Sequence, residues 1–216
     1  MELEIAHGQM VRQQVRAAEV LDTHILEVFS EIARHEFVPE RFRELAYADM
    51  RIPLPHGECM MMPSEEGHLL QALDIRPTDR ILEIGTGSGY LTACLGRLGG
   101  QVTSVDIHAD FIKPAQELLL DAGIGNATVS CMDAMQELPA GEFDVIAVTG
   151  SLPVYDDRFA RSLGIGGRLF VIVGSGPAME ARVITRVTES EFRTVPVFET
   201  DIPRLHNAPT PDPFQF

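Results

Sequence analysis

The sequence of 216 residues has no apolar run of the ~18 residues or more that a membrane-spanning helix needs. Its first residues, 1–4, include two acidic side chains and lack the apolar stretch of a secretory signal. We therefore expect a cytoplasmic protein that does not act at a membrane. The apolar fraction of 45% and the charged fraction of 23% are those of an ordinary globular chain, which excludes disorder, collagen and coiled coil.

Basic residues are scarce: 17 Lys and Arg are outnumbered by 32 Asp and Glu, and the formal net charge is −15. Nucleic-acid binding depends largely on Lys and Arg side chains that neutralise phosphates. No run of basic residues marks a local patch, so we expect neither nucleic acid nor an anionic membrane as a partner.

Cysteine and metal-ligand motifs are also few. The three cysteines, Cys59, Cys94 and Cys131, are odd in number and have no C-x-x-C spacing, which argues against a disulfide framework and a structural zinc site. The seven histidines include no H-E-x-x-H motif. His56 and His68 lie near Cys59 in the sequence, but their spacing is not that of usual ligand sets, and we predict no metal site.

Hydrophobic periodicity predicts helices in the first part of the chain. Residues 8–48 have a helical pattern, with Asp22 as the expected N-cap and a break at 37–39. Residues 51–63 carry two prolines, a glycine and three consecutive methionines before the final Pro63. We expect an irregular loop there, with its apolar side chains partly shielded from water.

From residue 64 to about 175, strand-like apolar runs alternate with helical segments. This alternation predicts βαβ units, and hence an α/β fold with a mostly parallel sheet and helices on both faces. Strands are predicted at 80–84, 102–105, 127–131, 143–148 and 168–173, and helices at 90–98, 109–122 and 156–163.

The last part of the chain differs from this pattern. Residues 182–188 and 193–200 are expected to form a β-hairpin. No regular structure is expected in the tail, which contains Pro203, Pro209, Pro211 and Pro213.

The most informative segment is the glycine-rich stretch Glu83–Tyr90, which follows a predicted strand and precedes a predicted helix. Its glycines allow a sharp turn and a close approach of a ligand to the backbone. The spacing is G-x-G-x-G, one residue shorter than the G-x-G-x-x-G of dinucleotide-binding loops. It resembles the pattern of class I S-adenosylmethionine-dependent methyltransferases, in which an early acid such as Glu83 suits the ammonium group of the cofactor.

Two further acids follow predicted strands in register with this loop. Asp106 ends the second strand about 20 residues after Gly85, where an acid can accept hydrogen bonds from both ribose hydroxyls. Asp133 follows the third strand, where such folds meet the adenine. We therefore predict S-adenosylmethionine as the cofactor. The expected contacts are Glu83, Gly85, Thr86, Gly87, Ser88, Gly89, Tyr90, Asp106, Ile107, Asp133, Ala134 and Thr149.

With its flanks, the chain resembles the protein-L-isoaspartate O-methyltransferase family over roughly residues 10–175, and more weakly to about 205. Glu83–Tyr90 matches the family's E-I-G-T-G-S-G-Y in every residue. The other matching stretches are Met10–Gln14, Phe37–Pro39, Ala46–Asp49, Ile52–Leu54, Pro63 and Gly166–Leu169.

The resemblance implies a Rossmann-like class I methyltransferase fold and a repair enzyme. Such an enzyme methylates the α-carboxylate of L-isoaspartyl residues in damaged proteins, and the ester then returns towards aspartate through a succinimide. On this basis we expect one methyltransferase domain over residues 1–216. It would comprise a helical cap and substrate loop (1–63), a cofactor-binding core (64–175), and a hairpin with a proline-rich tail (176–216).

Residues 57–63, which we call the substrate loop, depart from the family pattern G-Q-T-I-S-x-P. Cys59 stands in place of the threonine and Met61 in place of the serine. A thioether accepts hydrogen bonds only weakly and donates none, and losing a donor to a bound carboxylate costs about 1.5–3 kcal/mol. Either Ser64 supplies the missing hydroxyl, or the methionines form an adaptable apolar pocket for another acceptor, or they simply pack the loop.

A carboxylate acceptor is already ionised at neutral pH, so we expect positioning rather than a general base to drive methyl transfer. Thr149–Ser151, at the end of the fourth predicted strand, is expected beside the acceptor. The alternatives are a methyltransferase redirected to another small-molecule or protein acceptor, and a non-catalytic S-adenosylmethionine-binding protein.

Overall fold

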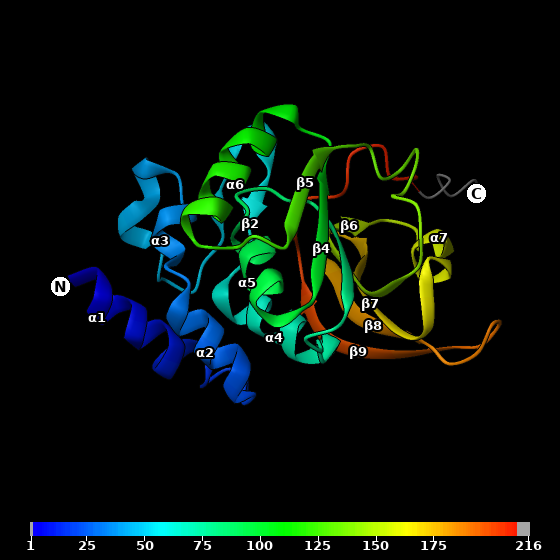
Figure 1. The fold of residues 1–216 in the computed structure, drawn as a ribbon, viewed down its shortest axis with the longest axis horizontal. Helices are drawn as coiled ribbons and strands as arrows, with labels where there is room; N and C mark the ends of the chain where they lie inside the picture. The colour runs from blue at the N-terminus through cyan, green and yellow to red at the C-terminus, as the bar shows by residue number, and fades with distance from the viewer. Residues whose placement is uncertain (1, 211–216) are drawn as a thin grey trace.

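The computed structural model describes residues 2–210 and has a central sheet of seven strands (Figure 1). These strands are β3 (Arg80–Ile84), β4 (Gln101–Asp106), β5 (Ala127–Cys131), β6 (Phe143–Leu152), β7 (Leu163–Ser175), β8 (Ala178–Arg186) and β9 (Phe192–Thr200). Their order is β5-β4-β3-β6-β7-β8-β9. The first five in this order are parallel, whereas β8 and β9 add an antiparallel extension. The predicted α/β fold with a mostly parallel sheet and a C-terminal hairpin is confirmed.

Both faces of the sheet are covered, which explains the nearly continuous apolar runs of its inner strands. Helices α4 (Pro63–Leu73), α5 (Tyr90–Leu98) and α6 (Ala109–Asp121) lie on one face, and the short α7 (Asp157–Arg161) lies on the other (Figure 1). The connection between β5 and β6 contains no helix. The covering is therefore asymmetric, with two hydrophobic clusters of unequal size on the two faces.

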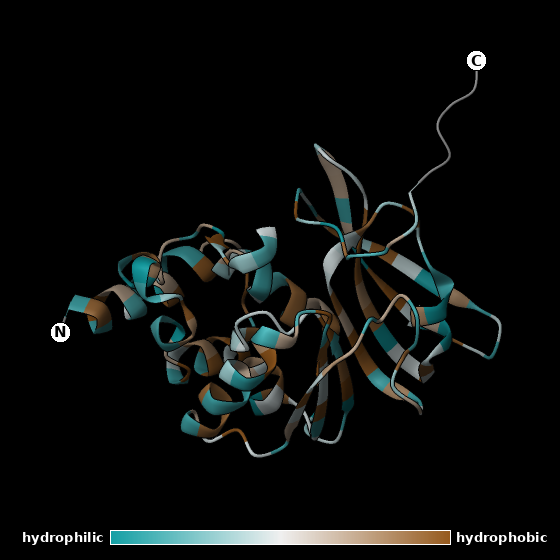
Figure 2. Ribbon diagram, turned by 90° about the horizontal axis from the view of Figure 1, so that it is seen from above, coloured by the Kyte–Doolittle hydropathy of each residue, from teal (hydrophilic) through white to brown (hydrophobic). Residues whose placement is uncertain are grey.

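The N-terminal part packs outside α4–α6 (Figure 2). It contains α1 (Glu2–Gln9), a π-helical stretch η1 (Met10–Val15), α2 (Thr23–Glu31), α3 (Arg34–Phe37) and the 3₁₀ helix η2 (Glu40–Leu45). Asp22 caps α2 as predicted, because its side chain accepts a hydrogen bond from the His24 backbone N–H at 2.8 Å. The predicted break is also present, since α3 ends immediately before Val38 and Pro39. Within residues 2–210 no helix is both long and apolar enough to span a bilayer.

The prediction of an irregular loop over residues 51–63 is wrong in part. β1 (Ile52–Pro53) and β2 (Cys59–Met60) form a short antiparallel pair joined by the 3₁₀ turn η3 (Pro55–Gly57). The turn is tight because His56 and Gly57 both have positive φ values, 63° and 82°. Met60 and Met61 are buried, as expected for a loop with so many apolar side chains.

The chain after β9 returns to the carboxyl end of β6 rather than running away from the sheet. The Ser151 N–H donates to the Pro203 carbonyl and the Leu205 N–H donates to the Ser151 carbonyl, both at 2.9 Å. Pro203 and Pro209 lie outside helices and strands, as predicted. The predictions for Pro211 and Pro213 concern positions outside the described residues.

Candidate active site at the carboxyl ends of β3, β4 and β6

The glycine-rich loop leaves the carboxyl end of β3, between β4 and β6. In parallel α/β sheets this position is a topological switch point, where the chain connections diverge and leave a crevice for ligands. Gly85, Gly87 and Gly89 all have positive φ values, 101°, 51° and 84°. A Cβ atom at Gly85 would lie 2.3 Å from Thr149 Oγ1, so only glycine fits there.

Thr149 fixes the loop from the neighbouring strand. Its hydroxyl lies 2.9 Å from the Ile84 carbonyl, to which it donates, and 3.1 Å from the Gly85 carbonyl. On the opposite side the Gly85 N–H donates to the Val105 carbonyl at 2.8 Å. The loop backbone is therefore held from both neighbouring strands before any ligand binds.

Asp106 is the acid that faces the loop from β4. Its Oδ2 accepts from the Gly87 N–H and its Oδ1 from the His108 N–H, each at 2.9 Å. Each carboxylate oxygen has a further lone-pair site, and Asp106 lines the cavity in front of the loop. It therefore has acceptor capacity for the vicinal hydroxyls of a ribose, and the predicted contact with them stays a prediction.

A cavity lies in front of this loop, bordered by the loop, the end of β4 and Thr149. A smaller adjoining hollow shares Met61, Gly85, Gly87 and Thr149 with it. Eight of the predicted site residues line the cavity: Met61, Gly85, Gly87, Asp106, Ile107, Asp133, Ala134 and Thr149. The hollow adds Thr86, Ser88 and Tyr90.

Glu83 does not line either space. Its Oε2 accepts hydrogen bonds from Thr92 at 2.5 Å and Ser104 at 2.6 Å, and the residue is fully buried beneath α5. Burial raises the pKa of Glu83 to about 7, against the lowering effect of these two hydroxyl donors. The geometry places its carboxylate as a support behind the loop, and its predicted contact with the cofactor ammonium group stays a prediction.

Two other predicted residues also lie outside the cavity. Gly89 begins α5, where a Cβ atom would lie 3.2 Å from that of Ala115, so its small size permits close packing of α5 and α6. The Ser64 hydroxyl donates to Asp49 Oδ2 at 2.9 Å, and its N–H donates to Oδ1 at 3.0 Å. Ser64 thus fixes the start of α4, and its role as a substitute donor is not supported by this contact.

The substrate loop forms an apolar wall of the cavity. Met61 is 5% exposed, and its carbonyl accepts from the buried Arg34 Nη2 at 2.7 Å. Arg34 also pairs with the buried Glu66. Burial raises the pKa of Cys59 to about 11, which keeps its thiol protonated at neutral pH.

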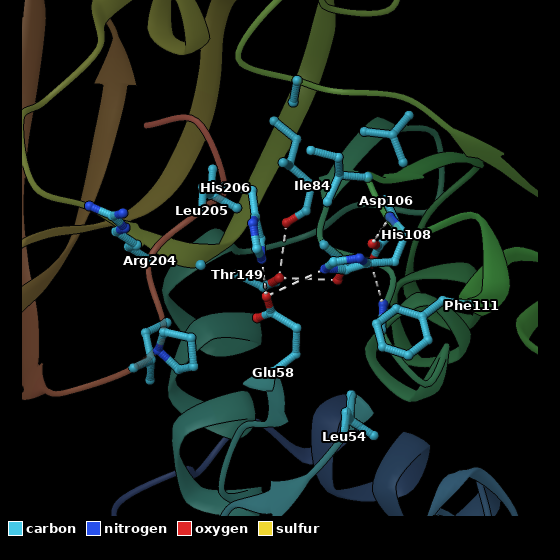
Figure 3. Close-up of a pocket in the computed structure, with 18 of the residues that line it drawn as sticks. Leu54, Glu58, Ile84, Asp106, His108, Phe111, Thr149, Arg204, Leu205 and His206 are labelled. Carbon is cyan, nitrogen blue, oxygen red and sulfur yellow. Dashed lines mark hydrogen bonds and ion pairs between the residues drawn. The ribbon is translucent and has the colours of Figure 1, made fainter. Parts of the chain in front are cut away.

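The rim of the cavity next to this wall holds residues that the sequence analysis missed. The segment 202–206, after β9, lines the cavity together with Glu58 and His108. Figure 3 shows His206, Glu58, His108 and Thr149 converging from separate segments. Asn207 Nδ2 donates to Asp133 Oδ2 at 2.8 Å, which fastens the same segment to the loop after β5. No local sequence pattern signals contacts between parts of the chain so far apart.

The fold and this site together define a class I methyltransferase: a glycine loop at the switch point, an acid at the end of the next strand, and a cavity between them. A family model described as "Protein-L-isoaspartate(D-aspartate) O-methyltransferase (PCMT)" matches residues 6–200. The chain belongs to the protein-L-isoaspartate O-methyltransferase family.

Individual relatives agree with this assignment. A protein from Rhodopseudomonas palustris named protein-L-isoaspartate O-methyltransferase 1 is 34% identical over 187 residues, which cover 86% of this chain and 76% of the relative. A Koribacter versatilis protein-L-isoaspartate O-methyltransferase is 35% identical over 180 residues, covering 83% and 81%.

A solved structure supports the fold independently. It is described as a Plasmodium falciparum protein-L-isoaspartate O-methyltransferase in complex with S-adenosyl-L-homocysteine. It superposes with a TM-score of 0.81 at 18% identity and covers 92% of this chain and 97% of its own.

Proposed function

We propose that this protein transfers the methyl group of S-adenosylmethionine to the α-carboxylate of L-isoaspartyl residues in damaged proteins and peptides. The observation that carries the proposal is the cavity in front of Gly85, bordered by Asp106 and Thr149, in a chain of the protein-L-isoaspartate O-methyltransferase family. The names of relatives such as the Rhodopseudomonas palustris protein support the same activity.

The residues present fit this cofactor. Gly85 leaves room beside Thr149 that any Cβ atom would fill, and Asp106 has acceptor capacity for two hydroxyls. Ile107 and Ala134 provide apolar surface suited to an adenine ring, and Asp133 lies beside them as an acceptor for its amino group. When bound, S-adenosylmethionine supplies an electrophilic methyl group on sulfur.

The protein's own contribution to the reaction is positioning. An isoaspartyl α-carboxylate is ionised at neutral pH, so no side chain needs to remove a proton. Holding donor and acceptor in line contributes up to ~7–11 kcal/mol in favourable cases. The apolar wall at Met61 and Cys59 and the segment 202–206 would orient the acceptor and exclude water.

Asp133 is held in its ionised form for this role. Burial alone would raise its pKa, but hydrogen bonds from Asn207, Met135 and Gln136 outweigh that effect and lower it. The carboxylate is therefore an acceptor throughout the neutral range, and its bond to Asn207 links cofactor recognition to the C-terminal segment.

The test is methyl transfer from radiolabelled S-adenosylmethionine to a short L-isoaspartyl peptide and to its L-aspartyl twin. We expect base-labile label on the isoaspartyl peptide alone. Asp106→Asn should lose the transfer, whereas Asp121→Asn, on the exposed end of α6, should retain it. Cofactor binding without transfer to either peptide would refute the proposal and favour a redirected or non-catalytic relative.

The substrate loop provides a second arm of this test. Cys59→Thr combined with Met61→Ser restores the hydroxyls of the family pattern. If the isoaspartyl peptide is already a good substrate, the double variant should change its KM by less than about tenfold. A large gain from negligible activity would show that the loop had been redirected. Two further statements remain predictions. One is the division of the chain into a helical cap, a cofactor-binding core and a C-terminal hairpin, and the other is a cytoplasmic location.

A further inference from the structure

Three potential metal ligands meet at the rim of the cavity. Glu58 Oε1 lies 3.0 Å from His206 Nε2 and 3.6 Å from His108 Nε2. One ligand atom from each of the three residues lies within 4.8 Å of the other two. They come from the substrate loop, the loop after β4 and the segment after β9, so folding alone brings them together (Figure 3).

The His108 ring nitrogen between these groups makes no hydrogen bond. His108 Nε2 is buried and makes no hydrogen bond, and its 3.6 Å separation from Glu58 is too long for one. Buried polar atoms are nearly always satisfied in native proteins. A buried imidazole nitrogen that makes no hydrogen bond and lies close to a carboxylate and a second imidazole is suited to bind a ligand that these groups share.

The orientation of this ring is fixed from the other side. His56 stacks on His108 with ring centroids 4.1 Å apart and an angle of 6° between the planes. His56 Nε2 in turn lies 2.8 Å from Asp110 Oδ2. Phe111 meets the His108 ring edge-on at 5.4 Å. These contacts hold Nε2 in place before any ion arrives.

We propose that Glu58, His108 and His206 form a binding site for a late first-row divalent cation such as Zn²⁺. Two imidazoles and one carboxylate are a common ligand set for this class of ion, with water in the fourth position. Zinc–ligand bonds of about 2.0–2.1 Å give tetrahedral ligand–ligand distances of about 3.3 Å. The two separations to Glu58 are already close to that value, and the ligand atoms of His108 and His206 lie within 4.8 Å of each other.

The three proposed ligands are not the potential metal ligands that lie near one another in the sequence. Of His56, Cys59 and His68, none is among the three proposed ligands, and His68 lies against Phe198 on the α4 side of the sheet. A bound ion would join the substrate loop to the C-terminal segment across the cavity rim. It would thus add a second fastening beside the Asn207–Asp133 hydrogen bond.

The experiment uses the full-length protein without an affinity tag, stripped of metal with a chelator and free of cofactor. Calorimetric titration with Zn²⁺ should show one ion per chain. Co²⁺ should give visible absorption bands typical of imidazole coordination in a low-symmetry site. Because neither readout involves methyl transfer, failure of the proposed activity would leave this result unaffected.

His206→Ala should weaken Zn²⁺ binding by more than about tenfold and abolish the Co²⁺ bands. His206 is 47% exposed on its side chain, so this variant should fold, and thermal unfolding would verify that. His24→Ala, a surface histidine in α2, is the matched control and should bind as the original protein does. Asp110→Asn should also retain binding, because Asp110 lies outside the ligand set.

Two results would overturn the proposal. One is the absence of stoichiometric Zn²⁺ binding by the original protein. The other is binding that survives in His206→Ala as well as it does in His24→Ala, which would place the ion elsewhere. Loss of binding in Asp110→Asn with retention in His206→Ala would move the site to His56, His108 and Asp110, and would equally refute the set proposed here.

Discussion

Replacing Gly85 by alanine tests whether the loop geometry of the cofactor site depends on Thr149. The φ value of 101° at Gly85 is unfavourable for any residue with a Cβ atom and costs about 1–3 kcal/mol. The new methyl group would also lie 2.3 Å from Thr149 Oγ1 and force that side chain to rotate. Thr149 would then lose its hydrogen bond to the Ile84 carbonyl, which is worth about 0.5–1.5 kcal/mol. The expected destabilisation is about 2–4 kcal/mol.

Gly123 offers a matched control, because it also has a positive φ, 70°, but no atom lies within 4 Å of a Cβ built there. Gly123→Ala should therefore lower the free energy of unfolding only by the cost of a positive φ at a residue with a Cβ atom, about 1–2 kcal/mol. Urea unfolding of both variants measures the difference, and calorimetric titration with S-adenosylhomocysteine measures the effect on the site. We expect Gly85→Ala to lose binding and Gly123→Ala to keep it. Equal stability and equal binding in the two variants would refute the argument from steric contact with Thr149.

Three further changes test other parts of the site. Burial raises the pKa of Glu83 from its ordinary 4.5 to about 7, so the folded state retains a proton that the unfolded chain releases. Stability should then fall by up to about 3 kcal/mol from this group as pH rises from about 5 to 8, and Glu83→Gln should reduce the slope in urea unfolding. A remaining slope would come from the buried Glu66, whose pKa burial raises to about 8. Asp106→Ala should weaken S-adenosylhomocysteine binding roughly tenfold to a hundredfold in calorimetry, because hydrogen bonds to a charged acceptor are worth about 1.5–3 kcal/mol. Gly150→Ala should displace the segment 202–206, since its Cβ would lie 2.6 Å from Leu205 Cδ2; limited proteolysis should then cut that segment faster.

The parallel core was predictable from sequence because its signals are local. Each inner strand is a short apolar run bounded by turn residues, and β3, α5 and β5 begin and end where the periodicity placed them. β6 and β7 extend beyond their predicted ends because tertiary contacts add residues to them. The end of β6 pairs with the returning segment at Arg204, which no pattern near residue 150 indicates.

The alternation of side chains along β3 explains why Glu83 lies beneath α5 and does not line the cavity. Leu82 and Ile84 belong to the cluster on the α7 face, whereas Ile81 belongs to the cluster on the α5 face. By alternation along the strand, Glu83 must project to the same side as Ile81, under α5. A side chain in that position reaches Thr92 and Ser104 rather than the cavity.

The rim of the cavity could not be predicted, because its contacts join segments far apart in the chain. His206 and Glu58 are 148 residues apart, and Asn207 and Asp133 are 74 apart. The two-residue strands β1 and β2 were missed for a related reason: prolines at 53 and 55 are typical of loops, and a pair this short has no periodicity to detect.

The two halves of the cavity, one for the cofactor and one for the methyl acceptor, are built in different ways, and this difference bears on substrate specificity. The cofactor half of the site is built by consecutive residues at the ends of β3 and β4, where a substitution at Gly85 would clash with Thr149 and one at Asp106 would remove the acceptor of the Gly87 N–H. In our proposal the acceptor half is built by the substrate loop and the segment 202–206, where buried side chains such as Met61 and Ile202 alternate with the half-buried Cys59 and the exposed Arg204. Changes at Cys59 or Arg204 should therefore alter which carboxylate is methylated at a smaller cost to stability and cofactor affinity than changes at the buried Met61. If such variants instead lost stability and cofactor binding together, the two halves would be one cooperative unit, and the loop could not be the element that determines the acceptor.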